Sequence, residues 1–210
     1  MYQKNSVQLG RSMIEMLGVL AIIGVLSVGG IAGYSKAMVK FKINKTASQV
    51  AEIATNVRTL FAQQQNCGGL TDETAMQMGI IPDEFGSSVN ESYNYSMEKD
   101  LRFSNAFGGD INVACLRNDV NDFTAKTKNF AITFGGLTRE ACVSLATMDW
   151  GNSSSSGLQG IMVSNGMMCG YVEKYTYYQK DLPISPSLAT TLCGCDDQGY
   201  DGCSITWYYN

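Results

Sequence analysis

Two features of this sequence could carry chemistry: a set of seven cysteines, and one acidic residue at the edge of an apolar stretch. No two cysteines have CxxC spacing and the chain has no histidine, so a structural zinc site is a poor alternative to disulfides. All seven follow the apolar stretch, which predicts disulfide formation in an oxidising compartment. The odd number leaves one thiol free or bonded between chains. The cysteines are Cys67, Cys115, Cys142, Cys169, Cys193, Cys195 and Cys203.

Enzymatic chemistry has little support in this sequence. Without histidine, neither a Ser/His/Asp nor a Cys/His nucleophile system can be assembled, and no phosphate-binding glycine loop follows a predicted strand. Asp196, Asp197 and Asp201 lie in an acidic turn between two cysteines, but this turn lacks the spacing and the closing glutamate of an EF-hand. We therefore expect no catalytic residues, no metal and no cofactor.

The apolar stretch has the length of a membrane span. The 20 residues from Met16 to Ser35 carry no formal charge, and as a helix they would cover roughly 30 Å, the thickness of the bilayer hydrocarbon. This run is too long for an ordinary signal peptide, and no clear cleavage site follows it before Lys36. A plain signal anchor would explain the hydrophobicity, but it leaves Glu15 without a role. A carboxylate at the edge of a membrane helix is a functional candidate by default.

The residues around Glu15 resemble a known processing motif. The run from Gly10 to Leu17 reads GRSMIEML, which is similar to the cleavage motif of type IV prepilins. The resemblance implies that residues 1–10 are a leader removed by prepilin peptidase, that Arg11 becomes the N-methylated first residue, and that Glu15 is the fifth residue of the mature chain. The family usually has Phe or another apolar residue at the position of Arg11.

The same resemblance implies a mechanism of assembly. While the subunit waits in the inner membrane, the charge of Glu15 is incompletely compensated. In a filament of identical subunits, Glu15 can meet the amino terminus of a neighbouring subunit, so that charge pairing favours assembly in register. The implied partners are other copies of the chain, prepilin peptidase, the pilus assembly machinery and an unknown surface receptor. Gly29 and Gly33 have a small-xxx-small spacing that would permit close helix approach, although glycine is also common in membrane helices.

Beyond the span, an apolar pattern predicts that the helix continues. No proline interrupts residues 11–65, so we expect one long helix over this range, with its membrane-spanning part at 16–35. Its second half should pack against the rest of the chain, because apolar residues recur at steps of four and three. These residues are Ile43, Ala47, Val50, Ala54, Val57 and Phe61.

Residues 66–210 are expected to form the globular head. The part up to about residue 110, and Ser87–Tyr95 especially, is interpreted as loop. Thr138 is the expected N-cap of a short helix that runs to about Trp150. An Asn165-Gly166 turn is expected to join two of the strands. The predicted strands are 111–116, 129–134, 160–164, 167–177 and 204–209.

Strands in succession after one long helix predict an α+β fold with a mainly antiparallel sheet. This arrangement resembles the pilin fold, and the segments FAITFGGL at 130–137 and SITW at 204–207 are similar to the type IVb pilins, including the PilS-like group. In that family a C-terminal cysteine closes a long loop, which implies a bond between Cys142 and Cys193. Cys195 and Cys203 bracket a short turn and could form a local bridge. The sequence does not pair Cys67, Cys115 and Cys169.

The charges are distributed unevenly along the chain. Lys36, Lys40, Lys42 and Lys45 follow the span and could lie against phospholipid headgroups, whereas only Lys4 and Arg11 precede it. A positive-inside count alone would place the head in the cytoplasm, but the cysteines and the leader place it outside. The part of the chain after Lys45 is acidic and lacks a basic stripe, which argues against nucleic-acid binding.

Taken with the resemblance, these features predict a structural subunit of a type IVb-like pilus that mediates surface contact or adhesion. It would lie in the bacterial inner membrane before assembly and in an extracellular filament afterwards. Two alternatives remain open at this point: a minor pilin or pseudopilin of a secretion or DNA-uptake machine, and a membrane-anchored binding protein that never polymerises.

Overall fold

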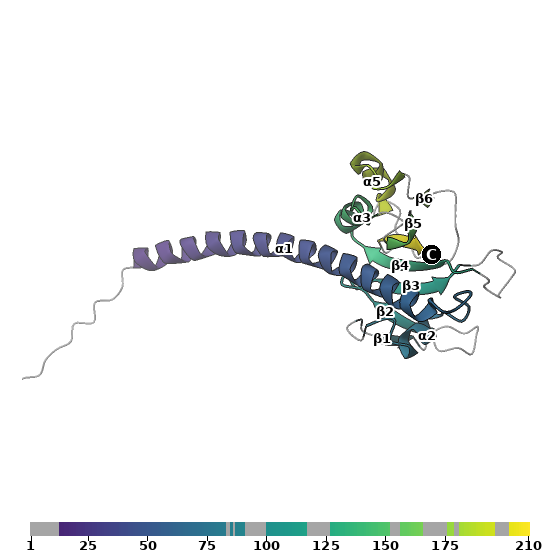
Figure 1. Ribbon diagram of the computed structural model, residues 1–210. Helices are drawn as coiled ribbons and strands as arrows, with labels where there is room; N and C mark the ends of the chain where they lie inside the picture. The colour runs from purple at the N-terminus through teal and green to yellow at the C-terminus, as the bar shows by residue number, and fades with distance from the viewer. Residues whose placement is uncertain are drawn as a thin grey trace, which may run out of the picture. The chain divides into compact units, whose positions relative to one another are not determined.

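One long helix forms the N-terminal part of the chain. In the computed structural model, which describes residues 13–82, 85, 87–90, 100–116, 127–151, 156–165, 176–178, 181–195 and 202–210, helix α1 runs unbroken over Met13–Phe61 (Figure 1). Glu15 in its first turn is negatively charged and Arg58 in its last turn is positively charged, which is the arrangement that the helix dipole favours. The chain divides between Phe41 and Lys42 into two compact units, so α1 contributes to both.

In the second unit, α1 buries a broad and mainly apolar stripe. The predicted seam is too narrow, because Ala47 and Phe61 are only half-buried while Ile53 is fully buried. A helix that packs on a globular domain buries a stripe at least about 100° wide, which includes neighbours of a strict seam. The buried residues are Ile43, Thr46, Gln49, Val50, Ile53, Ala54 and Val57.

The head contains one antiparallel sheet in the order β1-β2-β3-β4-β7-β5-β6. The final strand β7 is inserted between β4 and β5, and all seven of its residues are buried. The C-terminal segment is therefore central to the sheet (Figure 1). The strands are β1 Ser87–Asn90, β2 Asp100–Ser104, β3 Asp110–Cys115, β4 Phe130–Leu137, β5 Leu158–Asn165, β6 Thr176–Tyr178 and β7 Cys203–Tyr209.

The strands predicted at 111–116 and 204–209 are confirmed to within one residue at each end, as β3 and β7. The strand predicted at 129–134 is present as β4, which extends three residues further. The strand predicted at 160–164 is also present, as the longer β5. Of the strand predicted at 167–177, the described part is Thr176 and Tyr177 in β6, and the turn at Gly166 lies outside the described residues. The predicted α+β class with an antiparallel sheet is confirmed.

The segment interpreted as loop up to residue 110 contains regular structure, so that prediction is wrong. It holds helix α2 (Asp72–Gln77) and strands β1 and β2. Helix α3 (Arg139–Ala146) begins after Thr138, whose hydroxyl accepts from the Ala141 N–H, but it ends before the expected Trp150. Helix α5 (Pro186–Leu192) was not expected.

Aromatic side chains join the sheet to α3. Trp207 on β7 is fully buried, and its ring meets Phe134 of β4 and Trp150 at tilted or edge-on angles, with centroids 5.8 and 5.1 Å away. The Trp150 indole N–H donates to the Leu145 carbonyl at 2.9 Å. Edge-on aromatic pairs add stability beyond their buried area, so the segment after α3 is held tightly to the central strand.

Three disulfides lie in the described part of the head. Cys142 of α3 bonds to Cys193 at the end of α5, and Cys195 bonds to Cys203 at the start of β7. The first bond is the one that the family resemblance implies, and the second is the local bridge that the spacing allows. The third bond joins Cys67, which follows α1, to Cys115 of β3. Cys169 lies outside the described residues.

Asp72 fastens α2 to the sheet, which gives a first testable prediction. Its carboxylate accepts from the Asn112 side-chain amide at 2.7 Å and from the Val113 backbone N–H at 2.9 Å. Because hydrogen bonds to a charged group contribute about 1.5–3 kcal/mol, Asp72→Ala should lower the free energy of unfolding by an amount in this range. Chemical denaturation followed by circular dichroism would measure it.

Two variants control this prediction. Asp72→Asn keeps an oxygen acceptor for Val113 and should lose less stability than Asp72→Ala. Glu73→Ala removes the neighbouring exposed carboxylate, which accepts only a long 3.4 Å contact from Gln77, and should stay within about 0.5 kcal/mol of the wild type. Equal losses for Asp72→Ala and Glu73→Ala would contradict the assigned role of Asp72.

Candidate assembly surface

The first unit presents an apolar helix surface that nothing in the described structure covers. From Met13 to Tyr34, every large hydrophobic side chain is between 49% and 84% exposed. Soluble monomers rarely expose contiguous apolar patches larger than a few hundred Å². Within the described residues, α1 is also the one helix long and apolar enough to cross a membrane. The surface therefore requires either lipid or other apolar helices around it.

The glycines of this surface have open space beside them. A Cβ atom added at Gly29, Gly30 or Gly33 would meet no atom within 4 Å. Nothing in the described residues therefore requires a glycine at these positions. A neighbouring helix could approach closely there, since small residues allow close helix packing.

Glu15 lies on this apolar surface. Its side chain is exposed, and no described residue forms a hydrogen bond or an ion pair with it. Its neighbours Ile14 and Met16 are apolar and exposed as well. A carboxylate without a partner in such surroundings is costly once lipid or protein covers them. Gly10 and Arg11, the predicted cleavage and methylation sites, lie outside the described residues.

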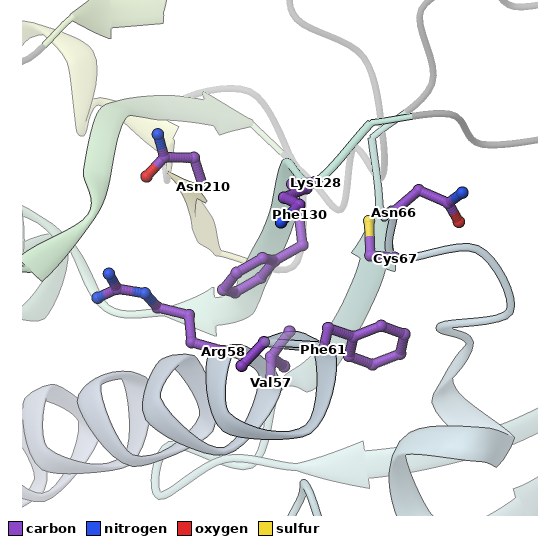
Figure 2. A pocket seen from close by; sticks show the side chains of 9 residues that line it. Val57, Arg58, Phe61, Asn66, Cys67, Lys128, Phe130 and Asn210 are labelled. Atoms are coloured by element: carbon purple, nitrogen blue, oxygen red, sulfur yellow. The ribbon is translucent and has the colours of Figure 1, made fainter. Parts of the chain in front are cut away.

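The described part of the head contains a further candidate site, a cavity of about 250 Å³ near the end of α1. Figure 2 shows the apolar side chains of Val57 and Phe61 on α1 opposite Phe130 of β4. Two cations, Arg58 and Lys128, lie at the same cavity. The remaining lining residues are Ala62, Asn66, Cys67 and Asn210.

The polar groups at this cavity are mainly cationic or held by other contacts. Arg58 donates to the Ser156 carbonyl at 2.9 Å. Burial raises the pKa of the neighbouring Tyr209 phenol well above its usual range, and the positive charge of Arg58 only partly opposes this rise. Cys67 is held in a disulfide, so the described lining offers no free thiol, carboxylate side chain or imidazole as a nucleophile or base.

The cysteine sulfurs do not form a metal site in the described structure. The Sγ atoms of Cys142, Cys193 and Cys203 lie within 4.8 Å of one another, but each belongs to a disulfide. Metal binding requires thiolates, which a disulfide does not provide. The acidic turn with Asp196, Asp197 and Asp201 lies outside the described residues.

Sequence reasoning located the apolar surface and Glu15 but missed the cavity. The residues that line it are spread from Val57 to Asn210, and the two cations are 70 positions apart in the sequence (58 and 128). No local spacing could have grouped them. They are brought together by the packing of α1 against β4.

A single apolar helix that continues into a disulfide-bonded antiparallel head is the architecture of type IV pilins. The fold matches a crystal structure of a type IVb pilin from Salmonella typhi with a TM-score of 0.53 and 20% sequence identity, over 78% of this chain and 97% of that one. The chain thus has the fold of this pilin.

Sequence comparison then gives the family. The bundlin family model matches residues 36–209, and the chain belongs to this family. It is similar to the major structural subunits of the bundle-forming pilus from Escherichia coli O111:H- and from Escherichia coli O127:H6 (strain E2348/69 / EPEC). Each is 25% identical over 185 residues, which cover 88% of this chain and 86% of the relative.

Proposed function

We propose that this chain is the structural subunit of a type IVb-like pilus. Prepilin peptidase cuts it after Gly10, the subunit waits in the inner membrane, and polymerisation through α1 carries it into an extracellular filament that mediates surface contact. The observation that carries the proposal is the uncovered apolar surface of α1 from Met13 to Tyr34. The same surface can be covered by lipid before assembly and by copies of itself afterwards.

The charge of Glu15 has a different environment in the bilayer and in the filament. In the bilayer its carboxylate lies near the hydrocarbon edge without a partner from the chain's described residues. In the filament, the free amino terminus at Arg11 of a neighbouring subunit provides an opposite charge. A charge-assisted hydrogen bond in an apolar environment favours the assembled state and fixes the axial register between subunits.

The relatives favour an abundant subunit over a minor pilin or a pseudopilin, because both are described as major structural subunits. The proposal is tested by electron microscopy of filaments sheared from the producing cells, with quantitative mass spectrometry of the purified fraction. We expect this chain to be the predominant protein of the filaments. A chain found only in trace amounts in the filaments would instead be a minor component.

The mature protein is expected to begin at Arg11. Intact mass spectrometry of the protein from its own cells should give a mass that lacks residues 1–10, and a methyl group on the new amino terminus would appear in the same spectrum. Gly10→Val should block the cut and yield the full-length chain as a matched control. A wild-type protein that begins at Met1 would contradict processing and, with it, the pilin mechanism.

A further inference from the structure

Two lysines on α1 lie immediately beyond the apolar surface. Lys36 is the first charged residue after the run from Met16 to Ser35, and Lys40 follows one helical turn later. Both side chains are exposed, as is Tyr34, which is 67% exposed. Residues four apart lie on the same face of a helix, so the two ammonium groups point in a similar direction.

The helix rise places both lysines in the headgroup layer of a membrane. If Glu15 marks one edge of the hydrocarbon, Lys36 lies about 30 Å further along α1, at the opposite edge. Lys40 lies about 6 Å beyond Lys36, and the polar layer on each side of a bilayer is roughly 5–7 Å thick. Tyr34 would then occupy the interface, where tyrosine is enriched.

The described part of the chain offers these lysines no counterion. No Asp or Glu occurs between Glu15 and Glu52, so neither lysine has an acidic residue three or four positions away. No described residue forms a hydrogen bond or an ion pair with either one. Lys42 differs, because its ammonium group lies 5.5 Å from the centre of the Phe107 ring in the head.

The disulfides decide which leaflet the lysines face. Because the head carries three of them, it lies on the non-cytoplasmic side, and Lys36 and Lys40 lie on that side of the span. Basic residues there run against the positive-inside bias of membrane proteins. An anionic partner in that leaflet would compensate for this arrangement.

We propose that Lys36 and Lys40 form a binding site for the phosphodiester headgroups of anionic phospholipids in the non-cytoplasmic leaflet of the inner membrane. The inference rests on the membrane-inserted stage of the proposed function. Lipid binding at this site fixes the depth of the waiting subunit. The headgroups must be released when the subunit leaves the bilayer for the filament.

The test uses the full mature chain reconstituted in nanodiscs of phosphatidylcholine with about one-third phosphatidylglycerol. Native mass spectrometry then measures which lipid remains bound to the protein. Since a lysine near an anionic membrane surface contributes a preference of about fivefold, the wild type should retain phosphatidylglycerol over phosphatidylcholine by at least about this factor. The double variant Lys36→Gln/Lys40→Gln should lose this preference. The double variant Lys128→Gln/Arg139→Gln, which also removes two positive charges but at exposed positions in the head, should keep it.

The proposal would be overturned if the Lys36→Gln/Lys40→Gln double variant retains phosphatidylglycerol or if the wild type does not retain it. A double variant that forms no filaments but still retains phosphatidylglycerol would also overturn it and would assign the lysines to contacts between subunits. Filament formation by intact cells is a separate measurement. A wild type that binds the anionic lipid but builds no filament would contradict the pilus function alone.

Discussion

Replacing Glu15 by valine is expected to abolish filament formation while leaving membrane insertion intact. The substitution removes the single acid of the apolar α1 surface and makes its first turn more apolar, so the bilayer-inserted state should be retained or favoured. If Glu15 pairs with a neighbouring amino terminus as proposed, the filament loses one charge-assisted contact per subunit. Because such a contact contributes about 1.5–3 kcal/mol, filament yield should fall by at least about tenfold. Quantification of sheared filaments against the membrane-bound pool measures both effects.

Two further variants separate charge from general damage to the helix. Glu15→Asp retains the carboxylate and should restore part of the filament yield. Glu52→Val makes the same chemical change at an exposed position of α1 in the head and should leave the yield near that of the wild type. Normal filaments from Glu15→Val would contradict the pairing of Glu15 with a neighbouring amino terminus.

The parts of the fold with a strong local signal could be predicted from the sequence. Helix α1 could be predicted because it contains no proline. Its first half is apolar on all sides, and its second half is apolar on one face. Strand β4 (FAITFGGL) is rich in residues that suit a buried strand. For these elements, local preference and tertiary packing favour the same structure.

The segment before residue 110 could not be predicted, because its elements depend on partners distant in sequence. Strand β1 reads Ser-Ser-Val-Asn, which has little preference for a strand, and it forms by pairing with β2. Helix α2 has only six residues and would not be stable alone, but Asp72 attaches it to β3. Tertiary contacts override weak local preferences in both cases.

One missed element did have a readable local signal. Ser185 precedes Pro186 at the first position of α5, and this order is typical of a helix start. The helix matters for the head because it carries the chain to Cys193. Its short length of seven residues gives no periodic pattern, so the start signal was the only one available.

The candidate sites differ in the same way, because one has a local sequence signal and the other depends on residues distant in sequence. Gly10, Arg11 and Glu15 lie within six consecutive residues, so a linear motif is enough to propose them as a processing and assembly site. The cavity near Arg58 depends on three segments that only the folded head brings together. A sequence pattern can predict the first kind of site, whereas the second kind is found only in the folded structure.

Removal of the Cys142–Cys193 bond is expected to cause a large loss of stability in the head. It joins residues 51 positions apart, and a loop of this length contributes on the order of 4 kcal/mol in the chain-entropy model. Domains of this kind are stable by only about 5–15 kcal/mol in total. The double variant Cys142→Ala/Cys193→Ala should therefore unfold at a markedly lower denaturant concentration, measured by circular dichroism under non-reducing conditions.

The matched control is the double variant Cys195→Ala/Cys203→Ala. Its bond spans only 8 positions, so the same model gives a smaller loss of about 2.5 kcal/mol. Both double variants leave no unpaired cysteine at the altered bond. If the two lose equal stability, loop length does not determine the contribution of these disulfides.

Single substitutions should behave differently, because the sulfurs of the two bonds are neighbours. Cys142→Ala leaves a free thiol at Cys193. In the structure, the Sγ atom of Cys193 lies within 4.8 Å of the Sγ atom of Cys203. A thiolate at Cys193 can attack the Cys195–Cys203 bond, which forms a new bond from Cys193 to one sulfur and releases the other as a thiolate. Non-reducing peptide mapping of Cys142→Ala should therefore detect Cys193 bonded to Cys203 or to Cys195. An intact Cys195–Cys203 bond with a reduced Cys193 would show that the neighbouring sulfurs do not exchange. In that case Cys142→Ala and Cys142→Ala/Cys193→Ala should have the same stability.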